Sequence, residues 1–188
     1  FHRAIEGHRQ VGSIFKPIVY LTALDKIKTE EGFVLATGLG KLFGSYRPFS
    51  PLTPIKDEPF DWTMNKKKWS PENYGKKVFG PVPFYYALKN SLNVSTALLG
   101  QTAGLNSIIE TAKKLGAYSE LKPFPSLTLG AFEMYPIEAL QIYTTLANVG
   151  QKVDLSFIRR VYNSKGETVY VYKAVPLPVF DDVLTSVL

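Results

Sequence analysis

The sequence predicts a mixed α/β (α+β) fold in which helices predominate. Several segments carry apolar side chains three or four positions apart, which is the spacing of an amphipathic helix. Residues 157–172 show the alternating pattern of a β-hairpin around an Asn-Ser-Lys-Gly turn. Residues 32–83 are rich in Gly, Pro and Lys and have no long periodic segment, which predicts an extended excursion of short strands and turns.

The first long helix is predicted over residues 12–24. Its apolar stripe comprises Phe15, Val19, Thr22 and Ala23. Because proline is tolerated in a helix only near the amino end, Pro17 places the start of this helix within about one turn. Ser13 therefore lies at or near the first helical position.

Four further helices are predicted over residues 84–90, 95–103, 106–115 and 136–148. In the third of these, Ser107 and Glu110 have the spacing of a capping box and Gly116 follows the end. In the fourth, Pro136 fits the first position. The predicted apolar face of that helix comprises Ile137, Leu140, Thr144 and Ala147.

The composition is that of a globular domain of ordinary size. The 188 residues are 45% hydrophobic and 20% charged, which excludes a wholly disordered chain. Cysteine is absent, so disulfides, thiolate metal sites and cysteine nucleophiles are excluded. No run of residues reaches the roughly 20 apolar positions of a membrane span.

The net charge of +6 suits anionic partners in general and does not single out nucleic acid. The lysines between positions 66 and 77 lack repeated aromatic or Arg interleaving, so a solvated loop face explains them better than a nucleic-acid patch. His2 and His8 have no carboxylate or cysteine nearby in the sequence. We expect neither a nucleic-acid partner nor a metal.

Both ends of the sequence resemble interior sequence. The chain opens on Phe1, and a short apolar segment behind a helix cap at Asp181 closes it without a glycine or a basic final turn. We expect that residues 1–188 are an internal piece of a longer protein.

Ser13 and Lys16 form the sharpest chemical pattern, S-x-x-K, at the start of the first helix. A serine hydroxyl needs a base within hydrogen-bond reach to act as a nucleophile near pH 7, and side chains three positions apart share a helix face. Free N–H groups at a helix start also favour developing negative charge. Taken alone, the pair is better explained by a serine cap and an ordinary lysine.

Ser91 and Asn93 form a second pattern, S-x-N, on a predicted turn between two helices. A hydroxyl at Ser91 can accept and donate a proton, and the Asn93 amide can hydrogen-bond a peptide group. Taken alone, these are common turn residues. The order S-x-x-K and then S-x-N is far more specific, because both patterns belong to penicillin-binding proteins and class A β-lactamases.

With these motifs, the sequence resembles the transpeptidase domain of a class A (bifunctional) penicillin-binding protein over nearly its whole length. The matching segments are residues 9–13 with 15–17, residues 20–24, the Trp-Ser-Pro-Glu-Asn-Tyr block 69–74, residues 87–94, residues 129–133, and Pro136, Glu138, Tyr143, Ala147, Asn148 and Gly150. The resemblance implies the serine β-lactamase and penicillin-binding-protein transpeptidase fold, of which residues 1–188 would form one partial domain that is mainly helical and lacks much of the central sheet.

The resemblance also implies an activity, namely D,D-transpeptidation that cross-links peptidoglycan stem peptides. Ser13 would be the acylated nucleophile, Lys16 its base, Ser91 the proton relay, and Asn93 a hydrogen-bond partner of the donor peptide. β-Lactam antibiotics would acylate the same Ser13, and no cofactor would be needed. The parent protein would carry a membrane anchor and a glycosyltransferase domain and would face the periplasm or the cell exterior.

One motif of the family, Lys-Thr/Ser-Gly, does not occur in this sequence. Lys28-Thr29 is followed by Glu30 and precedes Ser91, so it does not match. In the family this motif lies on a strand beyond the equivalent of Leu188, and we expect it there. We therefore expect the isolated 188 residues to be inactive and to expose apolar surface; acylation by a fluorescent penicillin at the full-length rate would contradict this.

Three other interpretations of the function remain open from the sequence. Two are hydrolases, a D,D-carboxypeptidase and a β-lactamase; Leu92 between Ser91 and Asn93, together with the block 69–74, argues against a β-lactamase. The third is a non-catalytic module that keeps the penicillin-binding fold without its chemistry. The joint presence of all four motif side chains argues against that module.

Overall fold

The computed structural model describes residues 2–29, 51–186 and 188, with the side chains of 27–29 excepted. Its helices are α1 (Arg3–Glu6), α2 (Lys16–Thr29), α5 (Phe84–Lys89), α6 (Asn93–Ala103), α7 (Leu105–Leu115), α8 (Pro136–Ala147) and α9 (Asp182–Ser186), with single 3-10 turns η1 (Gly12–Phe15), η2 (Tyr74–Lys76) and η3 (Pro125–Leu129). Helices predominate, as the sequence predicts, and all five predicted internal helices are present.

Strands in the described part of the chain pair only two by two, always antiparallel. The pairs are β1 (Arg9–Gln10) with β6 (Glu133–Met134), β2 (Pro54–Asp57) with β5 (Gly80–Pro83), β3 (Trp62–Met64) with β4 (Lys67–Trp69), β7 (Gln151–Lys152) with β10 (Leu177–Pro178), and β8 (Arg160–Tyr162) with β9 (Thr168–Val171). The short strands predicted within 32–83 are confirmed from residue 51 onward. Residues 32–50 of that prediction lie outside the described residues.

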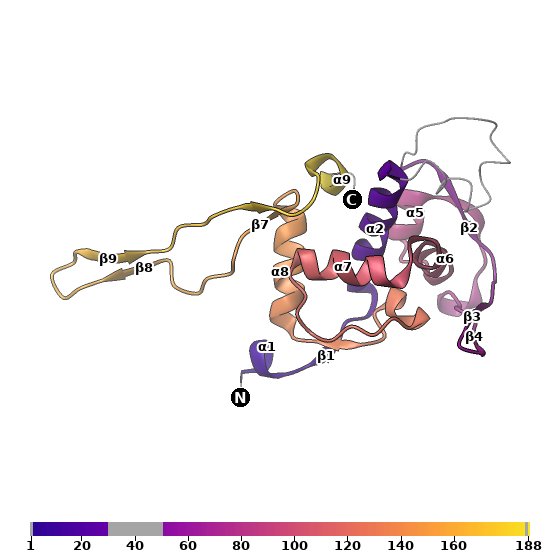
Figure 1. Cartoon of the computed structure of the whole chain (residues 1–188), viewed down its shortest axis with the longest axis horizontal. Coiled ribbons are helices and arrows are strands. Elements are labelled where there is room, and N and C mark those ends of the chain that lie inside the picture. The colour runs from indigo at the N-terminus through magenta and orange to yellow at the C-terminus, as the bar shows by residue number, and fades with distance from the viewer. Residues whose placement is uncertain (1, 30–50, 187) are drawn as a thin grey trace.

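Helix α2 is the central element, and α5, α6, α7 and α9 pack against it (Figure 1). Four consecutive side chains of α2, Ile18 to Leu21, are all buried, so the helix is covered on every side rather than along one stripe. The predicted stripe is buried as expected. The predicted helix over 12–24 begins instead as the 3-10 turn η1 and continues further, to Thr29.

Helices α6 and α7 are joined through one residue, Gly104, which has a φ of 88° and ends one helix while it starts the next. The predicted capping box of Ser107 and Glu110 is therefore wrong. Because α7 begins at Leu105, Ser107 falls inside the helix, and no side chain caps its start. The closing Gly116 is confirmed, and the apolar residues Ile108, Ile109, Ala112 and Leu115, which share one face of the helix, are buried.

Helix α8 begins at Pro136, as predicted, but buries a different face from the one predicted. The buried residues are Glu138, Ile142 and Thr145, whereas Leu140 is 52% exposed. The face is set by Glu138, whose carboxylate accepts hydrogen bonds from the backbone N–H groups of Tyr118, Ser119 and Tyr135 and from the Ser119 hydroxyl. A carboxylate whose oxygens accept hydrogen bonds in this way can be buried. A buried face predicted from apolar residues alone cannot include it.

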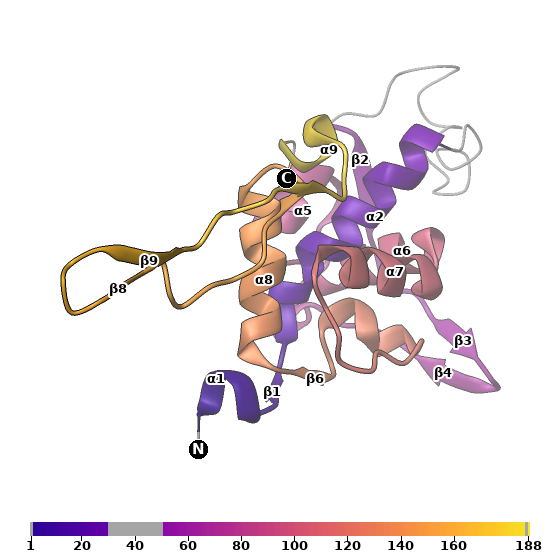
Figure 2. The ribbon, with the colours of Figure 1, turned by 60° about the vertical axis from the view of Figure 1, so that its left-hand side comes forward.

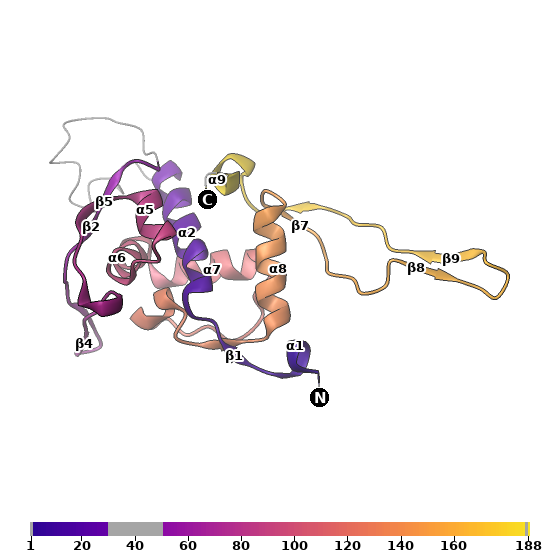
Figure 3. The ribbon, with the colours of Figure 1, turned by 180° about the vertical axis from the view of Figure 1, so that it is seen from behind.

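The predicted hairpin over 157–172 is confirmed as β8 and β9, which extend as an arm away from the helices (Figures 1 and 3). Every residue of both strands is exposed. Phe157, Ile158, Val169 and Tyr170 are among the exposed apolar side chains of this arm. From the arm the chain returns through β10 to α9, which contacts α2 (Figure 2). The predicted cap is confirmed, since Asp181 accepts from the N–H groups of Val183 and Leu184.

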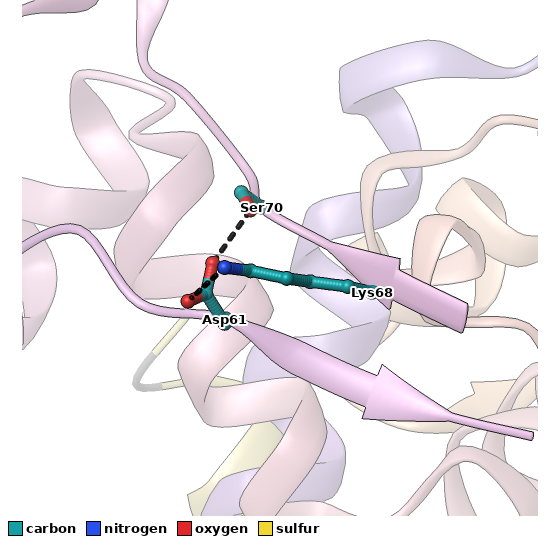
Figure 4. A network of polar contacts seen from close by, with 3 residues as sticks. All are labelled: Asp61, Lys68 and Ser70. Atoms are coloured by element: carbon teal, nitrogen blue, oxygen red, sulfur yellow. Dashed lines mark hydrogen bonds and ion pairs between the residues drawn. The ribbon is translucent and has the colours of Figure 1, made fainter. Parts of the chain in front are cut away.

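Three side chains, Asp61, Lys68 and Ser70, form polar contacts at the base of the β3–β4 hairpin (Figure 4). Asp61 accepts a hydrogen bond from Ser70 Oγ at 2.7 Å and pairs with Lys68 Nζ at 2.7 Å. The Lys68 ammonium and the Ser70 hydroxyl lower the pKa of Asp61, and all three groups are exposed. These contacts hold the start of the segment 71–74, which leads to the site. The other lysines between 66 and 77 are exposed, as expected.

No helix among the described residues is long and apolar enough to cross a lipid bilayer.

Candidate active site

Lys16 is the buried centre of the site, with only 2% of its surface exposed. Its ammonium group contacts three oxygen acceptors: the Ser91 carbonyl at 2.6 Å, Ser91 Oγ at 2.9 Å and Asn93 Oδ1 at 2.7 Å. A lysine ammonium has three N–H donors, so all three are used. The two sequence patterns, which lie 75 to 77 positions apart, are thus brought together by folding.

Burial lowers the pKa of Lys16 from 10.5 to about 8, because the ammonium is removed from water. The three oxygen acceptors favour the charged form and so oppose that shift. A lysine with a pKa near 8 holds a usable fraction of neutral amine close to neutral pH. This is the property that a general base requires.

Ser91 has a left-handed backbone conformation, with a φ of 53°. Its N–H donates to the Leu88 carbonyl, and the N–H of Leu92 donates to the Ala87 carbonyl, so the turn closes the end of α5. A non-glycine residue in this region costs about 1 kcal/mol. In return, both the hydroxyl and the carbonyl of one residue reach Lys16 Nζ. The residue with the strained backbone is therefore itself part of the site.

Asn93 is the first residue of α6, and its side-chain amide has a defined orientation. Nδ2 donates to the Glu72 carbonyl at 2.8 Å, so Oδ1 is the end that faces Lys16. Only one of the two Nδ2 hydrogens is used in this contact. The other remains for a ligand.

Ser13 lies in η1, one turn before Lys16, and is exposed. The backbone around it is held from several sides: the N–H of Gly12 donates to the Gly130 carbonyl at 2.9 Å, and Tyr143 Oη donates to the Ile14 carbonyl at 2.8 Å. The N–H of Lys16 donates to the Ser13 carbonyl. Ser13 Oγ is not among the acceptors of Lys16 Nζ, whose donors are taken by Ser91 and Asn93.

The arrangement is suited to acyl transfer to a hydroxyl. An exposed serine stands on a fixed turn, a buried lysine with a lowered pKa follows it, and a second hydroxyl contacts that lysine. Hydrogen bonds between nucleophile and base are often longer in the free enzyme and shorten when substrate binds. Within the described residues, no group of three or more His, Cys, Asp or Glu side chains is placed to hold a metal ion.

Comparison with known proteins identifies the family. No family model matches the chain. The chain is 39% identical over 171 residues to penicillin-binding protein 1B of Vibrio cholerae and 33% identical over 167 residues to penicillin-binding protein 1A of Aquifex aeolicus, matches that cover 90% and 89% of this chain. This chain belongs to the class A penicillin-binding proteins. It spans about a fifth of the length of these two relatives.

Solved structures agree on the fold of this penicillin-binding protein. Penicillin-binding protein 1A of Haemophilus influenzae matches 94% of this chain and 24% of its own, with a TM-score of 0.76 and 24% identity. The D,D-transpeptidase domain of a peptidoglycan glycosyltransferase from Eggerthella lenta matches 100% of this chain and 48% of its own, with a TM-score of 0.72 and 17% identity. The expected transpeptidase-domain fold is confirmed.

The sequence motifs assign no role to two polar residues beneath the site of this penicillin-binding protein. Asp57 is fully buried, and Asn73 is 6% exposed. Asn73 stands in the block 69–74, which the resemblance includes without a role for any single residue. Asp57 lies between two charged residues, in no motif, and only the folded chain shows what it contacts.

Proposed function

We propose that this chain carries the nucleophile, the base and the proton relay of a peptidoglycan D,D-transpeptidase. The contact of Lys16 Nζ with Ser91 Oγ and Asn93 Oδ1, one turn from the exposed Ser13, supports the proposal most directly. The family membership is consistent with it.

Acylation begins when the neutral amine of Lys16 takes the proton of the Ser13 hydroxyl. Ser13 Oγ attacks the carbonyl carbon of the penultimate D-Ala of a stem peptide, and the backbone N–H of Ser13 supplies one oxyanion donor. The proton held by Lys16 passes through Ser91 Oγ to the nitrogen of the terminal D-Ala. The peptide bond breaks, D-Ala leaves as an amine, and an ester remains on Ser13.

Deacylation reverses the proton path with a different nucleophile. The amine of a neighbouring stem peptide attacks the ester carbonyl, and its proton returns through Ser91 and Lys16 to Ser13 Oγ. A new peptide bond joins the two stems. A β-lactam follows the first half only: its ring amide opens, the ring nitrogen takes the proton, and the acyl group stays on Ser13. In both cases the spare Nδ2 hydrogen of Asn93 donates to the bound acyl donor.

We further propose that this penicillin-binding protein acts on the outer face of the bacterial inner membrane. Its relatives are about five times as long as this chain, and in such a parent a membrane anchor and a glycosyltransferase domain would accompany residues 1–188 as part of one transpeptidase domain. The Lys-Thr/Ser-Gly motif would complete the site from that additional sequence.

The test is covalent labelling of the full-length protein by a fluorescent penicillin. We expect Ser13→Ala to abolish labelling and Lys16→Met to slow it by about 1,000-fold, in the range that general bases contribute. Lys113→Met, on an exposed lysine of α7, serves as the control and should label like the wild type. Labelling that survives Ser13→Ala would overturn the proposal. The lifetime of the wild-type adduct separates the alternatives, since a hydrolase would release it within seconds to minutes.

A further inference from the structure

We propose that Asp57 and Asn73 are positioning residues that hold Asn93 in place against Lys16. The proposal rests on the acyl-transfer function proposed above and assigns to that site two residues outside its S-x-x-K and S-x-N motifs. Both residues act through the amino end of α6, the helix that begins at Asn93.

The amino end of α6 is capped from a distance. The first N–H groups of a helix have no partner within it, and the residue before α6, Leu92, has no side-chain acceptor. Asn73 Oδ1 accepts from the N–H of Asn93 at 2.7 Å and of Val94 at 3.1 Å. Asp57 Oδ1 accepts from the N–H of Ser95 at 3.3 Å. Three consecutive N–H groups are therefore satisfied by residues 20 to 38 positions earlier in the chain.

Asp57 fixes Asn73 in turn. One carboxylate oxygen accepts from Asn73 Nδ2 at 2.7 Å and from the N–H of Phe79 at 3.2 Å. The other accepts from Ser95 Oγ at 2.9 Å as well as from the Ser95 N–H. A fully buried carboxylate that accepts four hydrogen bonds is held in one plane, because tilting it out of that plane leaves a charge or a donor unpaired. Asn73 Oδ1 is therefore aimed at α6.

The same short segment also sets the side chain of Asn93. Asn93 Nδ2 donates to the Glu72 carbonyl, and Glu72 immediately precedes Asn73. Residues 72 and 73 thus determine both where the Asn93 backbone lies and which end of its amide faces Lys16. A helix cap alone would need only the first of these contacts. Movement of this segment would carry Asn93 Oδ1 away from the ammonium.

The experiment uses acylation of the full-length protein by a fluorescent penicillin. Asn73→Asp keeps the acceptor for α6 but sets a second carboxylate against Asp57. We expect its acylation rate constant to fall by about tenfold or more, since a displacement of about 1 Å can cost 100-fold. The exchanged pair, Asp57→Asn with Asn73→Asp, restores one amide donor facing one carboxylate. We expect it to acylate at least about threefold faster than Asn73→Asp but more slowly than the wild type, because a charge-assisted pair is reformed while the Phe79 N–H then faces an amide NH2 group.

Glu138→Gln is the matched control, because Glu138 is an equally buried carboxylate that accepts hydrogen bonds from backbone N–H groups but lies on α8, away from β2 and α6. It should lower the melting temperature while the rate constant stays within about twofold of wild type, since none of its hydrogen-bond partners contacts Lys16. Equal losses of rate in Asn73→Asp and Glu138→Gln, or an Asn73→Asp protein that acylates normally, would overturn the proposal. If Asn73→Asp does not fold, Ser95→Ala carries the test, because it removes one hydrogen bond to Asp57. We expect its acylation rate constant to fall, and a folded Ser95→Ala protein that acylates at the wild-type rate would refute the proposal. Ser13→Ala, measured in parallel, reports separately on the proposed function.

Discussion

The amino ends of α6 and α8 are both held by a buried carboxylate, but the two carboxylates come from different distances along the chain. Glu138 belongs to α8 itself, and one of its donors, the Tyr135 N–H, lies just before that helix. Asp57 reaches Ser95 of α6 from 38 positions away, and Asn73 reaches Asn93 from 20. A local cap fixes where a helix begins. A distant cap also fixes where that helix lies relative to another segment, and α6 is the helix that carries Asn93.

The first prediction concerns the stability of the amino end of α8 and has the largest expected change in the free energy of unfolding. Glu138→Gln replaces a carboxylate oxygen that accepts hydrogen bonds by an NH2 group that faces N–H donors. We expect the free energy of unfolding to fall by about 2 kcal/mol, the cost of leaving a buried donor unsatisfied. Urea denaturation measures it, with the exposed Glu120→Gln as the control. A loss below about 0.5 kcal/mol would show that the loop around Tyr118 rearranges freely.

The same carboxylate gives a pH dependence of defined sign. Burial raises the pKa of Glu138, but hydrogen bonds from Ser119, Tyr118 and Tyr135 outweigh burial, so the net pKa lies below 4.5. A carboxylate with a lowered folded-state pKa contributes stability fully above its unfolded pKa, and this contribution is lost as the pH falls through the folded pKa. The Glu138→Gln protein should therefore lose less stability than the wild type below about pH 4.5.

The second prediction addresses the α6 side, where the proposed mechanism requires the neutral form of Lys16. With a pKa of about 8, Lys16 is about one-tenth neutral at pH 7 and about nine-tenths neutral at pH 9. The acylation rate constant should therefore rise about tenfold between these values and level off above them. Acylation by a fluorescent penicillin across this range measures it. A rate that keeps rising toward pH 10.5 would indicate an amine in contact with water.

The third and smallest prediction uses α7, which begins without any side-chain cap. Ser107→Ala should change the free energy of unfolding by less than about 0.5 kcal/mol, whereas loss of a true cap costs about 1 kcal/mol. Thermal and urea unfolding of this variant measure the change. A loss of about 1 kcal/mol would support the capping box predicted from the sequence and would place the start of α7 at Ile108.

The sequence predicts contacts well where the signal is local or where a motif supplies it. The spacing of apolar residues predicts α5, α6, α7 and α8 to within two residues at each end. The proximity of Lys16 to Ser91 follows from the two motifs, since no helix period relates residues 75 positions apart. The face of α8 is mispredicted because apolar periodicity gives no weight to a carboxylate, and Glu138 is buried.

The contacts that Asp57 and Asn73 make with α6 could not be predicted from the sequence, for a physical reason. Asp57 and Asn73 are polar, lie in segments without period, and act on backbone N–H groups of α6. A backbone group places no demand on the residue type of its own position, so these N–H contacts leave no signature in the sequence; only the Ser95 hydroxyl contacts Asp57 through a side chain. The Gly104 junction likewise overrides the Ser107 pattern because the end of α6 decides where α7 can start.

The close approach of Gly12 and Gly130 limits how this protein can be engineered. A methyl group added at Gly130 would lie 2.1 Å from the Gly12 carbonyl oxygen, and Gly130 has a φ of 70°. Any side chain there would push the two backbone segments apart and tilt Ser13, which follows Gly12. A combinatorial library around Ser13 should therefore leave positions 12 and 130 as glycine and diversify the exposed neighbours instead.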